Sequence, residues 1–360
     1  MSNKVAILSD IHFGKRSVDF LNLQLEFFEK QFFPYIIENK IENVIQLGDI
    51  FDSRKYSLNQ MLSEVGKRFF HKFTELKINL YVIVGNHDTP DRESAKHSPL
   101  YQYKNKYIHI VGDSKHINID DVDISLHSYF NTKIVKANIG FFHTEFNGLL
   151  MDKRTIVEDR TNLPSNDFDK IYSGHFHSSP EKIYLNTPMP LSFESFGCKN
   201  GFFVLDTYKF KQDQKNYDLE FIENNVSPKF IKVYYKSKNE IKVDYGNNSD
   251  VVNNIDILKD KISNDIIELH IENVDDKLII DDLVTSIGKR LEYTFQDYLV
   301  GDVVATDEKM ETFTKDDLVN MKDLLNEYLV INEKEIPDSI DIKQLKKDFI
   351  EIYDEILTEI

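Results

Sequence analysis

The chain has 360 residues, a mass of 42.3 kDa, a hydrophobic fraction of 41% and a formal net charge of −17. This length exceeds the size at which one hydrophobic core usually stops growing, so we expect one large domain and at least one smaller unit. No apolar run approaches the roughly 18 residues of a membrane span, and the single cysteine, Cys198, excludes an internal disulfide. The acidic balance argues against a protein that grips nucleic acid through a broad basic surface.

From the N-terminus to about residue 206, short β-branched runs alternate with longer amphipathic stretches, which is typical of an α/β domain. The first run follows neither a basic leader nor a cleavable apolar segment, which predicts a cytoplasmic location. The predicted buried strands are Val5–Leu8, Asn43–Leu47, Leu80–Val84, Ile139–Phe142 and Lys170–Ser173, and the predicted helices are Leu21–Asn39 and Asn59–Leu76. Further strands are predicted over Lys106–Val111, Ile117–Leu126, Lys182–Asn186 and Gly201–Asp206, the last of which closes this domain.

A second region follows the polar stretch Lys209–Asn216, which we interpret as a linker. Strand patterns at Phe230–Tyr235 and Ile266–Ile271 and a helical pattern at Asp281–Tyr298 favour a small α/β cap. The tail then holds two amphipathic helical patterns, Lys315–Leu329 and Ile342–Leu357. Residues 307–360 contain 16 Asp and Glu against 7 Lys and supply −9 of the net charge. The rest of the chain is therefore closer to an ordinary charge balance.

Each buried strand of the first domain is followed by side chains of metal-ligand type, at the edge where ligands gather in open α/β sheets. In chain order these are Asp10-Ile-His12, Gly48-Asp49-Ile-Phe-Asp52, Gly85-Asn86-His87-Asp88, Phe142-His143 and Gly174-His175-Phe-His177. One Asp or His at a strand end often only caps a helix or satisfies a polar contact. Five such elements in this order indicate a metal site.

The mixture of ligand types indicates which ions would bind. Carboxylate, imidazole and amide groups favour a dinuclear site of Mn, Fe or Zn over an all-oxygen calcium cage. Two ions about 3.5–4 Å apart, bridged by a carboxylate, would activate a water and neutralise both reacting oxygens of a phosphoryl displacement. Gly48, Gly85 and Gly174 allow the sharp turns that bring backbone close to such ions. The sequence therefore predicts a two-metal phosphoesterase.

The motif set resembles that of the calcineurin-like metallophosphoesterase superfamily. Within it, the chain is similar to the SbcD-type nucleases of double-strand-break repair, above all to those of T-even-like bacteriophages, at residues 48–55, 84–88, 173–177 and 205–207. This resemblance is strong over the first 206 residues and rests on size and order alone for the cap. It implies a four-layer α/β/β/α sandwich with a small α/β cap and a helical tail. The cytoplasm would be that of the host cell if a phage encodes the chain.

The resemblance also implies a role for each motif residue. Two ions would be held by sets that share Asp49 as the bridge: Asp10, His12, Asp49 and His177 for one ion, and Asp49, Asn86, His143 and His175 for the other. His87 would act on the leaving 3′-oxygen as the catalytic histidine, with Asp88 orienting its ring. Asp52 is expected to contact a metal ligand without binding the ion itself. Glu145 is expected either to face solvent or to contact a ligand in the same way. The remaining histidines, which fit no motif, are interpreted as structural or exposed: His71, His97, His109, His116, His127 and His270.

The activity implied by the resemblance is that of a nuclease in DNA recombination and repair. It would be an exonuclease on duplex ends and an endonuclease on single strands, with Mn²⁺ as the expected ion and Mg²⁺, Fe²⁺ or Zn²⁺ as alternatives. An SMC-like ATPase of the SbcC type would supply many of the contacts to DNA phosphates, so the acidic net charge of this chain would not prevent DNA binding. The chain would form a homodimer within a heterotetramer. The tail stripe would dock on that ATPase or pack as a hairpin on its own chain; its residues are Leu345, Phe349, Ile352 and Ile356.

Two other functions remain open from the sequence. A phosphodiesterase or phosphoprotein phosphatase of the same superfamily would use the same metals, but it has no need for the cap and the tail. A non-catalytic interaction module is opposed by the intact His87 and the complete ligand set. The resulting prediction is a nuclease domain at residues 1–208, a DNA-binding cap at 217–305 and an ATPase-binding tail at 315–360.

Overall fold

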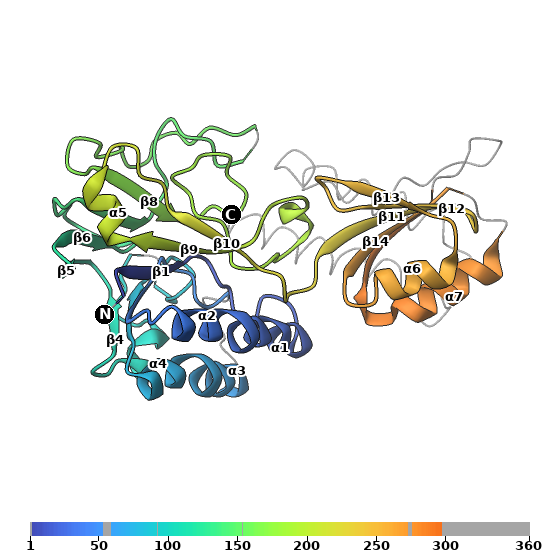
Figure 1. Ribbon diagram of the computed structural model, residues 1–360, viewed down its shortest axis with the longest axis horizontal. Coiled ribbons are helices and arrows are strands. Elements are labelled where there is room, and N and C mark those ends of the chain that lie inside the picture. The colour runs from blue at the N-terminus through green and yellow to red at the C-terminus, as the bar shows by residue number, and fades with distance from the viewer. Residues whose placement is uncertain (1, 53–58, 92, 153, 273–275, 297–360) are drawn as a thin grey trace, which may run out of the picture. The chain divides into compact units, whose positions relative to one another are not determined.

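The computed structural model describes residues 2–52, 59–91, 93–152, 154–272 and 276–296. Its first domain holds two sheets (Figure 1). The six-stranded sheet has the order β10-β9-β1-β2-β3-β4, and the four-stranded sheet has the order β5-β6-β7-β8. The six strands are β1 (Lys4–Leu8), β2 (Asn43–Gln46), β3 (Asn79–Ile83), β4 (Ile108–Val111), β9 (Gly201–Asp206) and β10 (Glu220–Glu223). The four strands are β5 (Ser114–Ile119), β6 (Val122–His127), β7 (Ile139–His143) and β8 (Lys170–Gly174).

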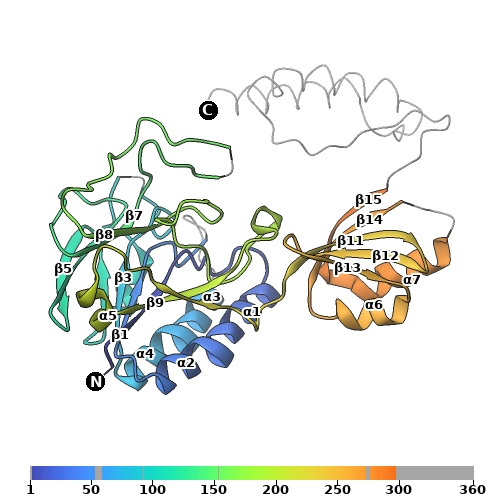
Figure 2. The same cartoon turned by 45° about the horizontal axis from the view of Figure 1, so that its top comes forward.

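Two helical stretches cover one face of the six-stranded sheet (Figures 1 and 2). In the first, α1 (Val18–Phe27) runs through the π-helical η1 (Phe28–Phe32) into α2 (Phe33–Glu38). In the second, α3 (Asn59–Val65) runs through η2 (Gly66–Phe70) into α4 (His71–Leu76). Phenylalanines fill the contact, and the ring of Phe32 in η1 lies 5.1 Å from that of Phe202 in β9. Each buried Phe contributes roughly 1.5–3 kcal/mol, so this packing holds the helices on the sheet.

Alternation along the strands defines the layers. Val5 and Ile7 of β1 pack against the four-stranded sheet, while Ala6 and Leu8 pack against the helices. The α/β class and the two packed sheets are therefore confirmed. On the outer face of the four-stranded sheet, Phe142 packs against residues of irregular segments. The described residues between 144 and 192 contain no helix, so this outer layer is built from loops.

Three sequence-based details of the first domain are wrong. The strand predicted over Ile117–Leu126 is a hairpin of β5 and β6, because Asp120 and Asp121 take φ angles of 49° and 62° that suit a tight turn. The segment Lys182–Asn186 makes one isolated bridge instead of a strand. The expected linker Lys209–Asn216 begins inside the short helix α5 (Thr207–Gln212), and the chain then returns as β10 to pair with β9. The six-stranded sheet thus extends beyond residue 208.

The second domain is a five-stranded sheet of order β13-β12-β11-β14-β15 with two helices. Its elements are β11 (Phe230–Ser237), β12 (Glu240–Asp244), β13 (Ser249–Val252), α6 (Ile255–Lys261), β14 (Ile266–Ile271), α7 (Lys277–Ile287) and β15 (Leu291–Gln296). The strands predicted at Phe230 and Ile266 are confirmed. The helix predicted over Asp281–Tyr298 is confirmed only in its first part, because α7 ends at Ile287 with Gly288, whose φ is 56°, as its C-cap, and β15 follows the turn η5.

The remaining described elements are the short 3-10 turns η3 (Pro99–Tyr103), η4 (Phe193–Ser195) and η5 (Gly288–Arg290). Within the described ranges, no helix has the length and apolar character needed to cross a membrane. The two predicted tail helices and their stripe of Leu345, Phe349, Ile352 and Ile356 lie outside the described residues.

Candidate metal centre

The segments that follow β1, β2, β3, β7 and β8 bring their polar side chains together. Ligand atoms of Asp10, His12 and His177, the first ligand group, lie within 4.8 Å of one another, and so do those of Asp49, His143 and His175, the second ligand group. His12 also forms a third cluster of this kind with Asp52 and His87. Asn86 joins the second group, because its Oδ1 lies 3.0 Å from both His143 Nε2 and His175 Nδ1. All seven residues that the sequence predicts as ligands therefore meet at one place.

Asp49 lies between the two groups. Its Oδ2 is 3.3 Å from His143 Nε2 in the second group and 3.7 Å from His12 Nε2 in the first. Its Oδ1 accepts a hydrogen bond from the His87 backbone N–H at 2.8 Å. The carboxylate of Asp49 therefore contacts both ligand groups.

The inward-facing donors fit metal ions. Ring nitrogens face each other closely, with 3.0 Å between the Nε2 atoms of His12 and His177 and 3.3 Å between His175 Nδ1 and His143 Nε2. Imidazole nitrogens and carboxylate oxygens gathered around a common point are the donor set that Mn, Fe or Zn prefers. The geometry leaves the identity of the ion open.

Backbone strain marks the same residues. Asp10, His12, Asp49 and His175 have φ angles of 37°, 50°, 53° and 90°, in a region that costs a residue other than glycine about 1–3 kcal/mol. Such outliers gather at functional sites, where other contacts hold them in place. The turn at Gly48 has φ of 98°, and a Cβ there would collide with the ring of His143. Only glycine allows this approach of the loop to the ligand.

Two buried glutamines hold the ligand loops, and sequence reasoning missed both. Gln24 of α1 donates to the carbonyls of Ile11 and His12 at 2.9 and 3.1 Å, which holds the loop that carries Asp10 and His12. Gln46 accepts from the Gly48 N–H at 2.9 Å and donates to its carbonyl at 2.6 Å. A polar residue on an otherwise apolar helical or strand face is the signal that could have found them.

The surroundings of His87 correct one expectation. Its ring Nδ1 lies 2.7 Å from the backbone carbonyl of Asp52, which can orient the ring. The carboxylate of Asp88, which was expected in that role, instead accepts the backbone N–H groups of Phe51 and Gly85, both at 3.0 Å. Asp88 therefore ties the second and third motif loops together. The ring of His87 lies 5.0 Å from that of His12, at the edge of the first group.

Asp52 contacts the ring nitrogen of His12 that faces away from His177. Its Oδ1 lies 3.3 Å from His12 Nδ1 and 3.6 Å from Lys15 Nζ. Burial acts to raise the pKa of Asp52, but the hydrogen bond and charge of His12, with Lys15, outweigh burial and lower that pKa. The carboxylate is therefore held ionised beside His12.

The site is strongly electronegative. Burial tends to lower the pKa of His143, yet the charges of Asp49 and Asp10 raise that pKa to about 9. Burial, followed by the charge of Asp49, raises the pKa of Asp88 to about 7. Several carboxylates thus share a small buried volume, and their mutual repulsion favours the binding of positive charge. Bound divalent cations would neutralise this charge.

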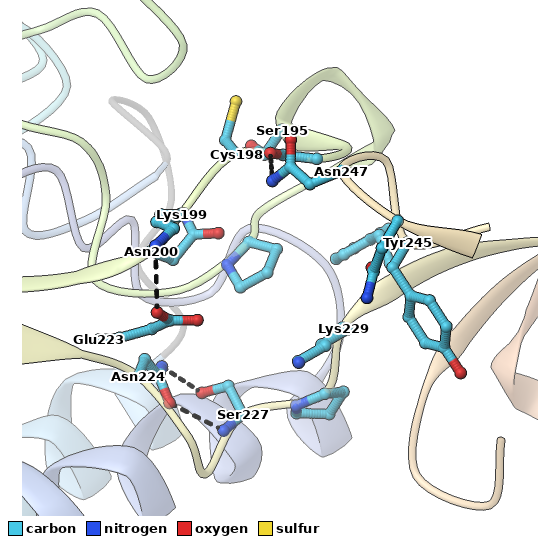
Figure 3. Close-up of a pocket in the computed structure, with 15 residues that line it drawn as sticks. Ser195, Cys198, Lys199, Asn200, Glu223, Asn224, Ser227, Lys229, Tyr245 and Asn247 are labelled. Atoms are coloured by element: carbon cyan, nitrogen blue, oxygen red, sulfur yellow. Dashed lines mark hydrogen bonds and ion pairs between the residues drawn. The ribbon is translucent and has the colours of Figure 1, made fainter. Parts of the chain in front are cut away.

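A separate cavity of about 390 Å³ is lined by polar groups (Figure 3). Its lining includes Lys199 and Glu223, whose charged atoms lie 3.7 Å apart, and Asn224, which hydrogen-bonds Ser227 at 2.8 Å. None of the ligand candidates lines it. The cavity is therefore not part of the metal centre.

Two packed sheets with carboxylate and histidine groups gathered at their strand ends are the arrangement of a metal-dependent phosphoesterase. Residues 3–186 match the family model of the calcineurin-like phosphoesterases, and the chain belongs to this family, whose members use divalent metal ions. The protein is thus a phosphoesterase of the hydrolase class.

A phage protein of similar sequence agrees with this assignment. The chain is 27% identical over 261 residues to exonuclease subunit 1 of Enterobacteria phage T4, covering 67% of this chain and 73% of that protein. This similarity agrees with the resemblance to SbcD-type nucleases. One solved structure with some likeness is an archaeal phosphodiesterase, which is 15% identical, with a TM-score of 0.28, and the match covers 61% of this chain and 99% of that one. Another is the Pseudomonas putida nuclease MPE, which is 16% identical, with a TM-score of 0.26, and the match covers 44% of this chain and 67% of that one. Neither TM-score is high enough to bear on the fold.

Proposed function

We propose that the chain is a metal-dependent DNA nuclease, an exonuclease on duplex ends and an endonuclease on single strands. The observation that carries this proposal is the meeting of seven ligand candidates and His87 at the strand ends of a phosphoesterase domain. The choice of DNA among phosphoesters is supported by the similarity to a phage exonuclease subunit. The process it would serve is DNA recombination and double-strand-break repair.

The two groups would each hold one divalent ion. Asp10, His12 and His177 would bind the first and Asn86, His143 and His175 the second, with Asp49 shared. Mn²⁺ is the proposed ion, and Mg²⁺, Fe²⁺ and Zn²⁺ are the alternatives. When bound, such a pair supplies an activated water and neutralises charge on the reacting phosphate oxygens.

His87 would act on the leaving group. Its Nδ1–H donates to the Asp52 carbonyl at 2.7 Å, which fixes the ring orientation. In the protonated ring, Nε2–H can then donate a proton to the departing 3′-oxygen. The backbone N–H of the same residue bonds Asp49, so the position of His87 is tied to the proposed bridge. Asp88 would contribute by holding the loop on which His87 sits.

DNA binding would be shared with partners. With a net charge of −17, the chain alone offers few phosphate contacts, and an SMC-like ATPase of the SbcC type would supply them. The phage relative is itself named as a subunit. The cap would position the duplex, the tail would dock on the ATPase, and two copies of the chain would form the homodimer of a heterotetramer.

A substrate panel tests the proposal. Purified full-length protein with Mn²⁺ is given a labelled linear duplex, a single-stranded circle, bis-p-nitrophenyl phosphate and p-nitrophenyl phosphate. We expect cleavage of both DNAs and of the diester, and little turnover of the monoester. A preference for the monoester over every diester would contradict the proposal and indicate a phosphatase.

A further inference from the structure

Glu145 lies beside the metal centre without joining either ligand group. Its Oε1 lies 2.9 Å from His175 Nε2. The other ring nitrogen of His175, Nδ1, lies 3.0 Å from Asn86 Oδ1 and 3.3 Å from His143 Nε2. The two nitrogens of this ring therefore have separate partners: Nε2 contacts Glu145, and Nδ1 faces the ligand group.

The contact with Glu145 selects one tautomer of His175. An ionised carboxylate only accepts hydrogen bonds, so His175 Nε2 must carry the hydrogen. In the neutral ring, Nδ1 then has no hydrogen and presents its lone pair to the ligand group. A metal-binding histidine commonly donates its other N–H to a carboxylate, which fixes both its tautomer and its ring orientation.

Arg160 holds Glu145 in turn. The Nε of Arg160 donates to Oε2 of Glu145, so both carboxylate oxygens are engaged. Further hydrogen bonds join the segment that carries Glu145 to the segment that carries Arg160. The Asn147 side chain donates to the Arg160 carbonyl at 2.7 Å, and the Asn147 backbone donates to the Thr161 carbonyl at 2.9 Å. The carboxylate is thus clamped between the ligand it supports and a cation whose own side chain is 57% exposed.

We propose that Glu145 is a positioning residue of the metal centre. It holds His175 with Nδ1 directed at the group of Asn86 and His143, and Arg160 keeps Glu145 in place. This inference rests on the proposed metal-dependent function and adds residues that no motif contains. Loss of Glu145 should therefore weaken the binding of only one ion, the one that His175 would hold.

Metal binding by the full-length protein tests this proposal. The variants are Glu145→Leu, which removes the acceptor at similar size, and Glu145→Gln, which keeps an oxygen for His175. The control is Glu158→Leu, at an exposed position of the neighbouring segment. Mn²⁺ binding is measured by isothermal titration calorimetry, and folding of the metal-free variants is checked by thermal unfolding.

We expect Glu145→Leu to weaken one of two binding steps by roughly 10- to 100-fold and leave the other nearly unchanged. Glu145→Gln should recover most of the loss, and Glu158→Leu should match the wild type. The inference is overturned if Glu145→Leu binds both ions normally, or if both steps weaken equally and Gln does not restore them. If Glu145→Leu does not fold, Arg160→Ala replaces it. Normal binding of both ions by Arg160→Ala, or equal weakening of both binding steps, would then overturn the inference. A wild-type protein that binds no Mn²⁺, Mg²⁺, Fe²⁺ or Zn²⁺ would instead contradict the proposed function.

Discussion

Asp49 combines three features that each cost folding free energy. Its side chain is buried, its φ is 53°, and its carboxylate repels that of Asp10, whose pKa is raised by burial and by the Asp49 charge. In the metal-free protein these costs are offset, because burial acts to raise the pKa of Asp49 but the charge and hydrogen bond of His143 and the charge of His12 outweigh burial and hold that pKa well below its usual range. If Asp49 is the bridge between two cations, metal binding would take over the role of these histidine charges and remove the repulsion with Asp10.

Replacing Asp49 by Asn tests both the pairing of this carboxylate with histidines and its part in metal binding. Asn fits the same space, tolerates a positive φ, and keeps an oxygen for the His87 N–H. We expect metal-free Asp49→Asn to melt below the wild-type temperature, because it loses the ion pairs of Asp49 with His143 and His12. Added Mn²⁺ should stabilise the wild type by about 2.7 kcal/mol at 100 times its Kd and the variant by far less.

Thermal unfolding with and without Mn²⁺ measures both effects. Asp123→Asn, at an exposed carboxylate on β6, is the matched control and should respond to Mn²⁺ like the wild type. Equal Mn²⁺ stabilisation of Asp49→Asn and wild type would show that Asp49 is not a ligand.

At the scale of single elements, a pH effect is expected from β6. His127 is fully buried, its ring stacks on Phe142 at 4.4 Å, and its Nε2 lies 2.9 Å from Ser125 Oγ. Burial lowers its pKa to about 4, against an ordinary value of 6.5. Between these values the unfolded chain binds more protons than the folded one, so the free energy of unfolding falls as the pH drops from 6.5 towards 4. The loss from this residue should reach roughly 3 kcal/mol.

His127→Phe tests that expectation, since a phenyl ring can keep the stacking on Phe142 but does not titrate. Urea unfolding at pH 7 and at pH 4.5 gives the free energy of each protein. Because acidic groups titrate in both proteins, the difference between them isolates His127. The variant should lose distinctly less stability on acidification than the wild type. Identical losses would mean that His127 is not held neutral in the fold.

Elements were predictable where the pattern is local and apolar. The five buried strands lie within one residue of their predicted ends, because each is a short β-branched run that ends in a motif. Failures occurred where one or two residues decide the path. The Asp120–Asp121 turn splits one predicted strand into a hairpin, and Gly288 ends a helix whose predicted second half is β15.

The metal centre was likewise predictable only where its residues belong to local sequence motifs. Its seven ligand candidates come from motifs, so the sequence alone could name them. The contacts of Gln24, Glu145 and the Asp52 carbonyl join segments that are far apart in the sequence or use backbone atoms. No motif records such contacts, which depend on how the loops meet.

For the whole molecule, the distribution of charge leads to a prediction about the tail. Residues 307–360 supply −9 of the net charge and contain the stripe of Leu345, Phe349, Ile352 and Ile356. An acidic segment does not add to the grip on DNA, whereas an apolar stripe suits a groove on a partner. We therefore expect the tail to serve association with the ATPase, not catalysis.

Deleting residues 315–360 should abolish co-purification with the SMC-like ATPase and leave Mn²⁺-dependent cleavage of short oligonucleotides within about threefold of wild type, because every proposed ligand lies before residue 178. Phe349→Asp in the full chain is a milder test of the same stripe, and Lys343→Ala outside the stripe is its control. Association that survives the deletion would mean that the tail is not the docking segment.

In the proposed function, the two ligand groups and His87 cleave DNA together. The most direct measurement is digestion of an end-labelled linear duplex by the purified protein, with and without Mn²⁺, alongside His87→Ala and the control His116→Ala. We predict digestion that requires the metal, falls by about 10²–10⁴-fold in His87→Ala, and is unchanged in His116→Ala. No digestion with Mn²⁺, Mg²⁺, Fe²⁺ or Zn²⁺, together with hydrolysis of a phosphomonoester, would contradict the account.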